Sequence, residues 1–436
     1  MYVDALCNEI KEKASSYTQY DVISVFFGGG TPSIMTGNDI LKIMSVIKSE
    51  YSLVEDCEIS MEVNPGTIGE NETKLDAYKR AGINRLSIGL QSANDNELKM
   101  LGRIHDVDAF EDTYDKAILA GFKNLNVDLI SGLPGQKVED FKKSLEYVLN
   151  LEPQPKHISA YSLIIEEGTP FYDMYGEKCE NEDDNAENNM DYTQIESELC
   201  SEDSDREIYK ITKDILGKHG YHRYEISNYS KEGYECRHNK VYWQRGNYLG
   251  FGVGSSSLVE NIRWKNQDDV YEYINANGMT SVIETEKLSI KEQMEEFMFL
   301  GLRMMKGVSE KDFRNYFGQG FPKEYKDIIN KYVSMGLMRC VYEDGEKAIA
   351  VSTMNDDSRV MSVGSGGDIG VMSAGSGDDV GVMSAGSGDD VGVMSTCFEC
   401  ENIGVMSTCF ECEYIRVMLT DKGINVSNVI MAEFIF

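Results

Sequence analysis

Side chains able to bind a ligand gather in motifs that follow short apolar runs in the first third of the chain. Glycine-rich backbone can approach an anionic or amino-acid ligand because no Cβ stands in the way. Carboxylates accept hydrogen bonds from ribose hydroxyls or from an ammonium group. The motifs are FFGGGTPS (26–33), MEVNPG (61–66), SIGLQS (87–92), LGRIH (101–105) and VDLISGLPGQ (127–136). Their residue types indicate a site for a polar organic ligand.

Each polar residue in these motifs has an ordinary structural explanation when it is taken alone. A tight turn explains some of the glycines in Gly28–Pro32, although three glycines followed by Thr-Pro exceed what a turn needs. The side chains that could equally be satisfied strand-end residues are Glu62, Asn64, Gln91, Arg103 and Asp128. Their shared position after strands is the argument for a site, because the carboxyl ends of parallel strands form one face.

Strand-like and helical patterns alternate through the same region. The expected strands are Val22–Phe27, Glu58–Val63, Arg85–Leu90, Asn124–Ile130 and His157–Ile165. The expected helices between them are Asn38–Tyr51, Glu70–Ala81, Asp108–Ala120 and Val138–Leu149. Such alternation is typical of βαβ units and a parallel sheet. With a first helix at residues 3–13 and a strand expected before it, the pattern predicts an α/β fold, an incomplete (β/α)6 barrel.

Composition limits the classes of function. The 436 residues carry a formal charge of -32, which argues against binding to nucleic acid or to an anionic membrane surface. No apolar run approaches the roughly 20 residues of a membrane span, so we expect no integral membrane segment. Ten cysteines behind an amphipathic, acidic N-terminal helix suggest reduced thiols in the cytoplasm.

The rest of the chain divides into further segments. Residues 176–205 are acidic and poor in aliphatic side chains, which predicts an insert that is disordered or loosely helical. The expected domains are a barrel at 1–175, a connecting region at 206–286, and an α-rich domain at 287–436 that ends in a winged-helix-like hairpin. Tandem repeats of 11 and 12 residues interrupt that last domain at 360–416.

Two segments contain residues that could bind a metal ion or a cofactor. The CxxC pairs in the repeats could bind zinc, but the second pair is a copy of the first, so duplication explains the spacing. These cysteines are Cys397, Cys400, Cys409 and Cys412. In YECRHNKVYW (234–243), His238 beside Tyr242 and Trp243 could contact a flat macrocycle, although a lone histidine is more often structural.

Several of these motifs, in this order, resemble those of the radical S-adenosylmethionine proteins of the coproporphyrinogen-dehydrogenase-like group. The closest resemblance is to HemW-type haem chaperones, and it covers roughly 2–175, 206–350 and 416–436. The quoted motifs are FFGGGTPS, MEVNPG, NRLSIGLQS, LGRIH, NVDLISGLPGQ, YEISNYSKEGYECRHNKVYW and YLGFGVGSSS. The resemblance implies a radical-SAM barrel with a HemN-like C-terminal part.

The resemblance also implies cofactors and their residues. S-adenosylmethionine would be held by Gly29, Gly30, Thr31, Glu62, Gln91, Arg103 and Asp128. The family's [4Fe–4S] cluster lies on a CxxxCxxC loop, a motif that this sequence does not contain. We therefore expect a truncated sequence that, as given, is not catalytically competent and has no metal ligands of its own, because no electron would reach the sulfonium. His238 becomes the expected haem contact.

The resemblance favours a haem chaperone that delivers haem to acceptor proteins, membrane-associated respiratory proteins among them. The GLQS motif (89–92) and the HNxxYW motif (238–243) are the features that favour this branch. Two alternatives stay open. One is an oxygen-independent coproporphyrinogen III oxidase, and the other is a remnant that binds a ligand without redox activity.

Overall fold

The computed structural model describes residues 1–69, 73–175, 199–279, 282–342, 350–351, 360–361, 372–373 and 415–435. The four CFEC cysteines and residues 176–198 of the acidic segment lie outside the described residues. The chain separates into two compact units. The first consists of Met1–Tyr242 and Gly246–Lys287, and the second of Trp243–Arg245 and Leu288–Phe436.

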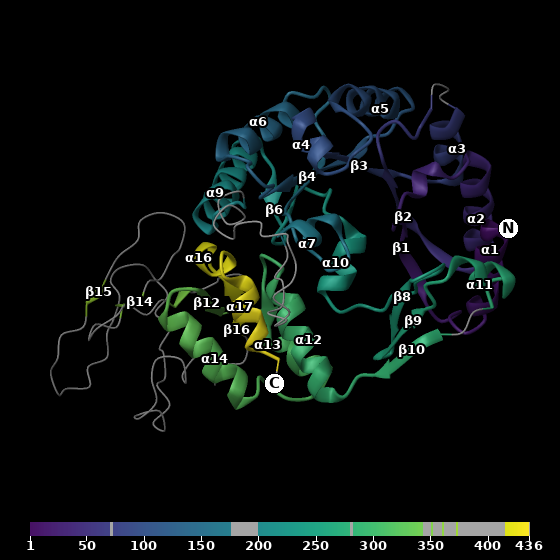
Figure 1. Ribbon diagram of the computed structural model, residues 1–436. Helices are drawn as coiled ribbons and strands as arrows, with labels where there is room; N and C mark the ends of the chain where they lie inside the picture. The colour runs from purple at the N-terminus through teal and green to yellow at the C-terminus, as the bar shows by residue number, and fades with distance from the viewer. Residues whose placement is uncertain are drawn as a thin grey trace, which may run out of the picture. The chain divides into compact units, whose positions relative to one another are not determined.

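The first unit is built on a curved, seven-stranded sheet with the order β1-β2-β3-β4-β5-β7-β6 (Figure 1). Strands β1 to β5 pair in parallel, as the alternating pattern predicts. They span Asp21–Phe27, Ser52–Val63, Arg85–Gln91, Asn124–Ser131 and His157–Ser162. The short strands β6 (His222–Arg223) and β7 (Asn228–Ser230) extend the sheet in antiparallel pairing. The prediction of an incomplete parallel barrel is therefore confirmed.

Helices cover the outer face of this sheet, where the core lies (Figure 1). They are α1 (Tyr2–Ala14), α2 (Gly37–Glu50), α3 (Thr73–Ala81), α4 (Asp95–Met100), α5 (Val107–Leu119), α6 (Val138–Leu149) and α9 (Glu202–Lys218). In β2, Ile59, Met61 and Val63 belong to this core, whereas Ser60 and Glu62 alternate with them. Because successive strand side chains point to opposite faces, the polar set lines the inside of the barrel.

The structure differs from the expected elements in several places. Helix α9 begins at Glu202, inside the range expected to be an insert, because the Ser201 side chain accepts a hydrogen bond from the N–H of Ser204 and caps it. Strands β6 and β7 join the barrel sheet, although the sequence assigned this region to a separate connecting segment. Strand β2 begins earlier than expected, and the short helices α4 and α7 (Pro170–Tyr175) were not expected.

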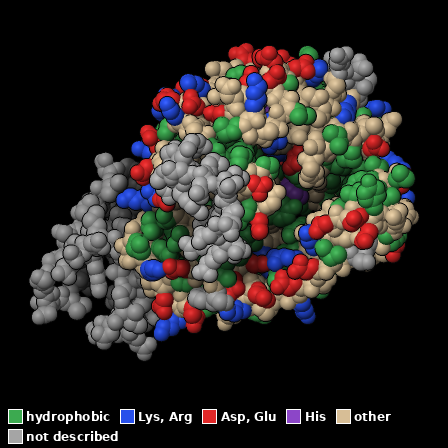
Figure 2. Space-filling view, viewed as in Figure 1, with side chains coloured by type: hydrophobic (Ala, Val, Ile, Leu, Met, Phe, Trp, Pro, Cys, Tyr) green, Lys and Arg blue, Asp and Glu red, His purple; other side chains and the backbone are tan. Residues whose placement is uncertain are grey.

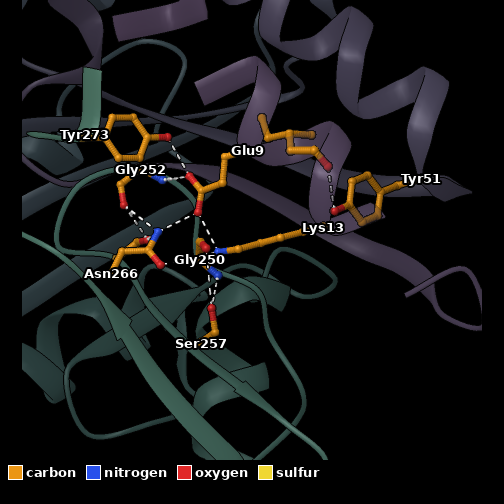
Figure 3. A network of polar contacts seen from close by, with 10 residues as sticks. Glu9, Lys13, Tyr51, Gly250, Gly252, Ser257, Asn266 and Tyr273 are labelled. Atoms are coloured by element: carbon orange, nitrogen blue, oxygen red, sulfur yellow. Dashed lines mark hydrogen bonds and ion pairs between the residues drawn. The ribbon is translucent and has the colours of Figure 1, made fainter. Parts of the chain in front are cut away.

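A smaller antiparallel sheet, with the order β10-β9-β8, completes the first unit. Its strands are β8 (Ser256–Val259), β9 (Ile262–Asn266) and β10 (Val282–Lys287), and helix α11 (Val270–Asn275) follows β9. Figure 3 shows how this part meets α1 through the Glu9 carboxylate, which is 2% exposed. It accepts hydrogen bonds from Tyr273 Oη at 2.6 Å, Asn266 Nδ2 at 2.6 Å and Gly252 N at 2.8 Å. Lys13 Nζ pairs with it at 2.6 Å.

The second unit is rich in helices. They are α12 (Ile290–Leu302), α13 (Glu310–Phe317), α14 (Lys323–Ser334), α16 (Asp421–Ile424) and α17 (Ser427–Ala432). Strands β11 (Val308–Ser309), β16 (Ile415–Leu419) and β12 (Met338–Tyr342) pair side by side in antiparallel fashion, which confirms the predicted hairpin. The sheet continues through β13 (Ala350–Val351), β14 (Val360–Met361) and β15 (Met372–Ser373).

An aromatic cluster forms the core of this second unit. Phe313 is fully buried and lies edge-on to Phe321 at 5.0 Å and close to Phe317 at 4.6 Å, measured between ring centroids. Such aromatic pairs add to the free energy gained from burial alone. The helices of this unit therefore pack around rings together with buried aliphatic side chains such as Leu302, Ile329 and Ile430.

The described chain has a surface of mixed charge and lacks a long apolar helix. Figure 2 shows acidic side chains spread over the visible face with lysines and arginines between them, rather than one basic patch. Across the described ranges, no helix combines the length and the apolarity required to cross a bilayer.

The Glu9 network generates a prediction about stability. Glu9→Ala removes the acceptor of several buried donors, so we expect it to lower the free energy of unfolding by about 3 kcal/mol. Glu12→Ala, on the exposed side of the same helix, is the matched control and should change it by less than about 0.5 kcal/mol. Urea unfolding followed by circular dichroism measures both. Equal losses for the two variants would contradict the role given to this carboxylate.

Candidate functional site

The glycine loop after β1 presents bare backbone to open space. Gly29 and Gly30 have φ angles of 81° and 63°, in the left-handed region that glycine adopts without strain. A Cβ built on either residue would meet no atom within 4 Å. The N–H of Gly29 donates a hydrogen bond to Glu62 Oε2 at 3.2 Å, and Asn64 Nδ2 donates to Thr31 Oγ1 at 3.2 Å. The ends of β1 and β2 thus form one structure with room for a ligand.

Two carboxylates interact electrostatically inside the barrel: Glu62, next to the last residue of β2, and Asp128, within β4. Burial raises the pKa of Glu62, and the negative charge of Asp128 raises it further. Burial also raises the pKa of Asp128, although hydrogen bonds from Ser159, Asn126 and Ser87 act against that rise. Ser87 Oγ donates to Asp128 Oδ2 at 3.0 Å, and Asn126 Nδ2 donates to Oδ1 at 2.8 Å. A pair of this kind attracts hydroxyl donors or a positively charged group.

Tyr161, at the end of β5, joins the remaining site residues and was missed by sequence reasoning. Its hydroxyl donates to Gln91 Oε1 at 3.2 Å. Burial is the largest cause of the raised pKa of Tyr161. The negative charges of Asp128 and Glu62 also raise this pKa, whereas the positive charge of Arg103 lowers it. All of these groups therefore lie near one phenol. The alternation His-Ile-Ser-Ala-Tyr along β5 was the available signal, because it places Tyr161 on the inner face.

Gln91 has an unusual backbone. Its φ is 68°, which is uncommon for a residue other than glycine. A Cβ on the neighbouring Gly89 would lie 2.5 Å from Gln91 Nε2, so the glycine allows the amide to fold back toward the inner face. The conformation places the amide of Gln91 where Tyr161 can hold it.

Deeper in the barrel, His157 forms a second buried polar centre that sequence reasoning did not select. Its Nδ1 lies 2.6 Å from Asn126 Oδ1, so the ring donates there, and its Nε2 accepts from Tyr224 Oη at 2.8 Å. Burial lowers the pKa of His157 well below its ordinary range, and the charge of Arg85 lowers it further. The ring is therefore neutral and serves to join β4, β5 and the segment that follows them.

Helix α10 (Arg237–Trp243) carries His238 and lies on the concave side of the sheet (Figure 1). The imidazole stacks on Phe26 of β1, with ring centroids 4.5 Å apart and planes 7° from parallel. Its Nδ1 lies 3.3 Å from Ser24 Oγ, and its Nε2 lies 3.0 Å from Tyr242 Oη. Desolvation lowers the pKa of His238 to about 4, with Glu58 opposing. His238 is thus a neutral ring with both nitrogens engaged.

Glu58 of β2 holds the first turn of α10. Its carboxylate accepts hydrogen bonds from the backbone N–H groups of Arg237 and His238, each at 3.2 Å, and from Cys236 Sγ at 3.5 Å. A negative charge at a helix N-terminus is favourable because the exposed N–H groups there carry partial positive charge. The inside of the barrel therefore positions the segment that contains His238.

The cysteines of the described chain do not suit an iron–sulfur cluster. They are Cys7, Cys57, Cys200, Cys236 and Cys340, and none of them forms a disulfide. Burial raises the pKa of the Cys57 and Cys236 thiols to about 11, whereas a cluster requires thiolates. Within the described ranges, no three His, Cys, Asp or Glu side chains converge on a point where a metal ion could be held.

Family models match both units. Residues 4–148 match the radical SAM superfamily, and residues 288–340 match the HemN C-terminal domain. Among solved structures, coproporphyrinogen III oxidase (HemN) from Escherichia coli aligns with a TM-score of 0.66 and 19% identity. The alignment covers 100% of this chain and 82% of that one, and it supports the fold alone.

Curated relatives narrow the family. The chain is 33% identical to "Heme chaperone HemW" of Lactococcus lactis, over 79% of this chain and 85% of that protein. It is also 33% identical to "Heme chaperone HemW" of Bacillus subtilis, over 76% of this chain and 83% of that protein. It is 30% identical to mouse "Radical S-adenosyl methionine domain-containing protein 1, mitochondrial", over 71% and 69% respectively. The chain belongs to the HemW family of haem chaperones in the radical SAM superfamily.

Proposed function

We propose that this chain binds haem and delivers it to acceptor proteins. The observation that carries the proposal is 33% identity to a haem chaperone over 79% of this chain. Haem-accepting proteins, including membrane-associated respiratory proteins, are the partners that follow. None of the described cysteines forms a disulfide, which agrees with a reducing compartment such as the cytoplasm.

We place the haem contact at His238. A neutral imidazole is the form that binds haem iron, and the lowered pKa keeps this ring neutral at physiological pH. Phe26 stacks on a face of this imidazole, and the ring of Tyr242 packs against it at a right angle, so both provide aromatic surface beside it. Coordination through Nε2 requires the Tyr242 hydroxyl to leave it, which costs about 1 kcal/mol for one hydrogen bond.

The strand-end residues suit S-adenosylmethionine. Gly29 and Gly30 leave backbone open to an amino-acid moiety, and Thr31 lies beside them. Carboxylates Glu62 and Asp128 accept hydrogen bonds from ribose hydroxyls or the ligand's ammonium group and favour its positive charge. The further residues assigned to this ligand are Gln91, Arg103 and Tyr161. The bound cofactor supplies radical chemistry in its superfamily only together with a reducing cluster.

Haem binding is tested with His238→Ala. We expect the apparent Kd for haem to rise about tenfold and the Soret band to shift, because about 1.4 kcal/mol of ligation is lost. His219→Ala is the matched control, since that exposed ring directly follows α9 and bonds the carbonyl of Ile215. Its haem titration should overlay that of the unchanged chain.

The same experiment separates the alternatives. If His238→Ala changes neither the affinity for haem nor the haem spectrum, His238 is not a haem contact. Conversion of coproporphyrinogen III to protoporphyrinogen IX by a chain extended with a cluster loop, without haem binding, would replace the chaperone proposal with the oxidase.

Cofactor binding should depend on pH. The pKa of Glu62 is raised above its ordinary 4.5, so the carboxyl takes up a proton at a higher pH than usual as the pH falls. Protonation removes a hydrogen-bond acceptor and a negative charge, so affinity for S-adenosylmethionine should fall from pH 7 toward pH 5. Calorimetric titration across this range measures the change. Glu62→Gln should bind weakly at all these pH values with a flatter profile, and an unchanged slope in this variant would exclude Glu62 as its source.

A further inference from the structure

Lys74, in the first turn of α3, reaches between the loops that follow β1 and β2. Its Nζ donates hydrogen bonds to two backbone carbonyls, those of Ser33 at 2.5 Å and Thr67 at 2.9 Å. Desolvation lowers the pKa of Lys74. Among the described residues, no carboxylate lies within ion-pair distance of this ammonium. Through these two hydrogen bonds the ammonium group joins the loop that follows β1 to the loop that follows β2, and we call this arrangement a clamp.

The clamp continues to the glycine loop. Ser33 is fully buried, and its Oγ accepts from the N–H of Asn64 at 3.1 Å and lies 2.8 Å from Thr67 Oγ1. Thr67 Oγ1 also lies 2.6 Å from the carbonyl of Asn64. The Asn64 side chain then reaches Thr31 Oγ1 at 3.2 Å. Lys74 is thereby connected to the loop through shared neighbours, without facing the open space over Gly29 and Gly30.

The glycine loop needs such support because glycine residues do not favour a single backbone conformation. Gly29 and Gly30 can adopt many conformations in an unconstrained chain, so ordering them costs more entropy than ordering other residues. Neither glycine has a side chain to pack. The loop geometry must therefore come from its flanks, and hydrogen bonds from a charged donor are the stronger kind available for this.

We propose that Lys74 is a positioning residue for the S-adenosylmethionine site, holding the loop Gly28–Pro32 in its binding conformation through Ser33 and Thr67. The inference rests on the proposed binding of that cofactor and adds a residue that touches the loop's support rather than the ligand. If its role were purely structural, Lys74 would contribute to the stability of the fold, and its loss would not weaken S-adenosylmethionine binding more than haem binding.

Lys48 offers a matched control. Its Nζ also donates to a backbone carbonyl, that of Ala81 at 2.7 Å, in the same unit. Lys74→Met and Lys48→Met therefore remove the same kind of bond, but only the first touches the support of the glycine loop. Thr67→Val removes the hydroxyl next to Ser33 and gives a second variant should Lys74→Met fold poorly.

The experiment measures S-adenosylmethionine and haem binding to the full chain by calorimetry, with hydrogen exchange of the loop peptide. We expect Lys74→Met to weaken S-adenosylmethionine binding about tenfold or more, as one lost interaction of 1.4 kcal/mol would. Exchange in residues 28–33 should become faster, while the haem Kd stays within about twofold. Lys48→Met should leave all three unchanged, and Thr67→Val should weaken S-adenosylmethionine binding in the same direction as Lys74→Met.

Different failures have different meanings. If the unchanged chain binds S-adenosylmethionine and Lys74→Met binds it as tightly as Lys48→Met does, the positioning role is wrong. If Lys74→Met weakens both ligands together with a general rise in exchange, its role is structural and the inference fails as well. If the unchanged chain does not bind S-adenosylmethionine, the proposed cofactor site and this inference fall together, while the haem proposal stands on its own titration.

Discussion

The requirement that every buried polar group find a partner shapes the inside of this barrel. Parallel sheets usually read as continuous apolar runs, because both faces are buried. Here β2 to β5 alternate, with aliphatic side chains toward the helices and polar ones inward. An unpaired polar group in such a place costs free energy comparable to a lost hydrogen bond or more. Asn126 illustrates the solution, since its side chain bonds Ser87, Asp128 and His157 at once. Side chains at the ends of neighbouring strands are thereby oriented before any ligand arrives.

The same constraint explains where α10 lies. The five parallel strands leave β1 at an open edge of the sheet, and its inner face carries Ser24 and Phe26. The segment around His238 covers these residues and satisfies Glu58, whose buried carboxylate would otherwise lack donors. The segment that contains His238 therefore completes the polar inside of the barrel, and Glu58 holds its first turn.

Binding and support are divided among different residues at the strand ends. Gly29 and Gly30 face open space, whereas Ser33, Thr67 and Lys74 have their polar atoms satisfied within the protein. Loops that carry function on a rigid scaffold generally need such support. The Glu9 network has the same character on the other side of the unit. It is a buried carboxylate that several donors share, and it joins α1 to the small sheet without contributing to the site.

The sequence by itself determined the parallel α/β class, the five main strands to within a few residues for most of them, and the strand-end position of Glu62, Gln91 and Asp128. Local periodicity and glycine placement carry that information, because they depend on neighbours along the chain. Only the tertiary structure decided that β6 and β7 join the barrel, that Tyr161 bonds Gln91 and Lys74 bonds the carbonyl of Ser33, and that His238 lies against β1 with both nitrogens bonded. These depend on contacts between residues far apart in sequence, such as Glu58 with His238, which no local pattern encodes.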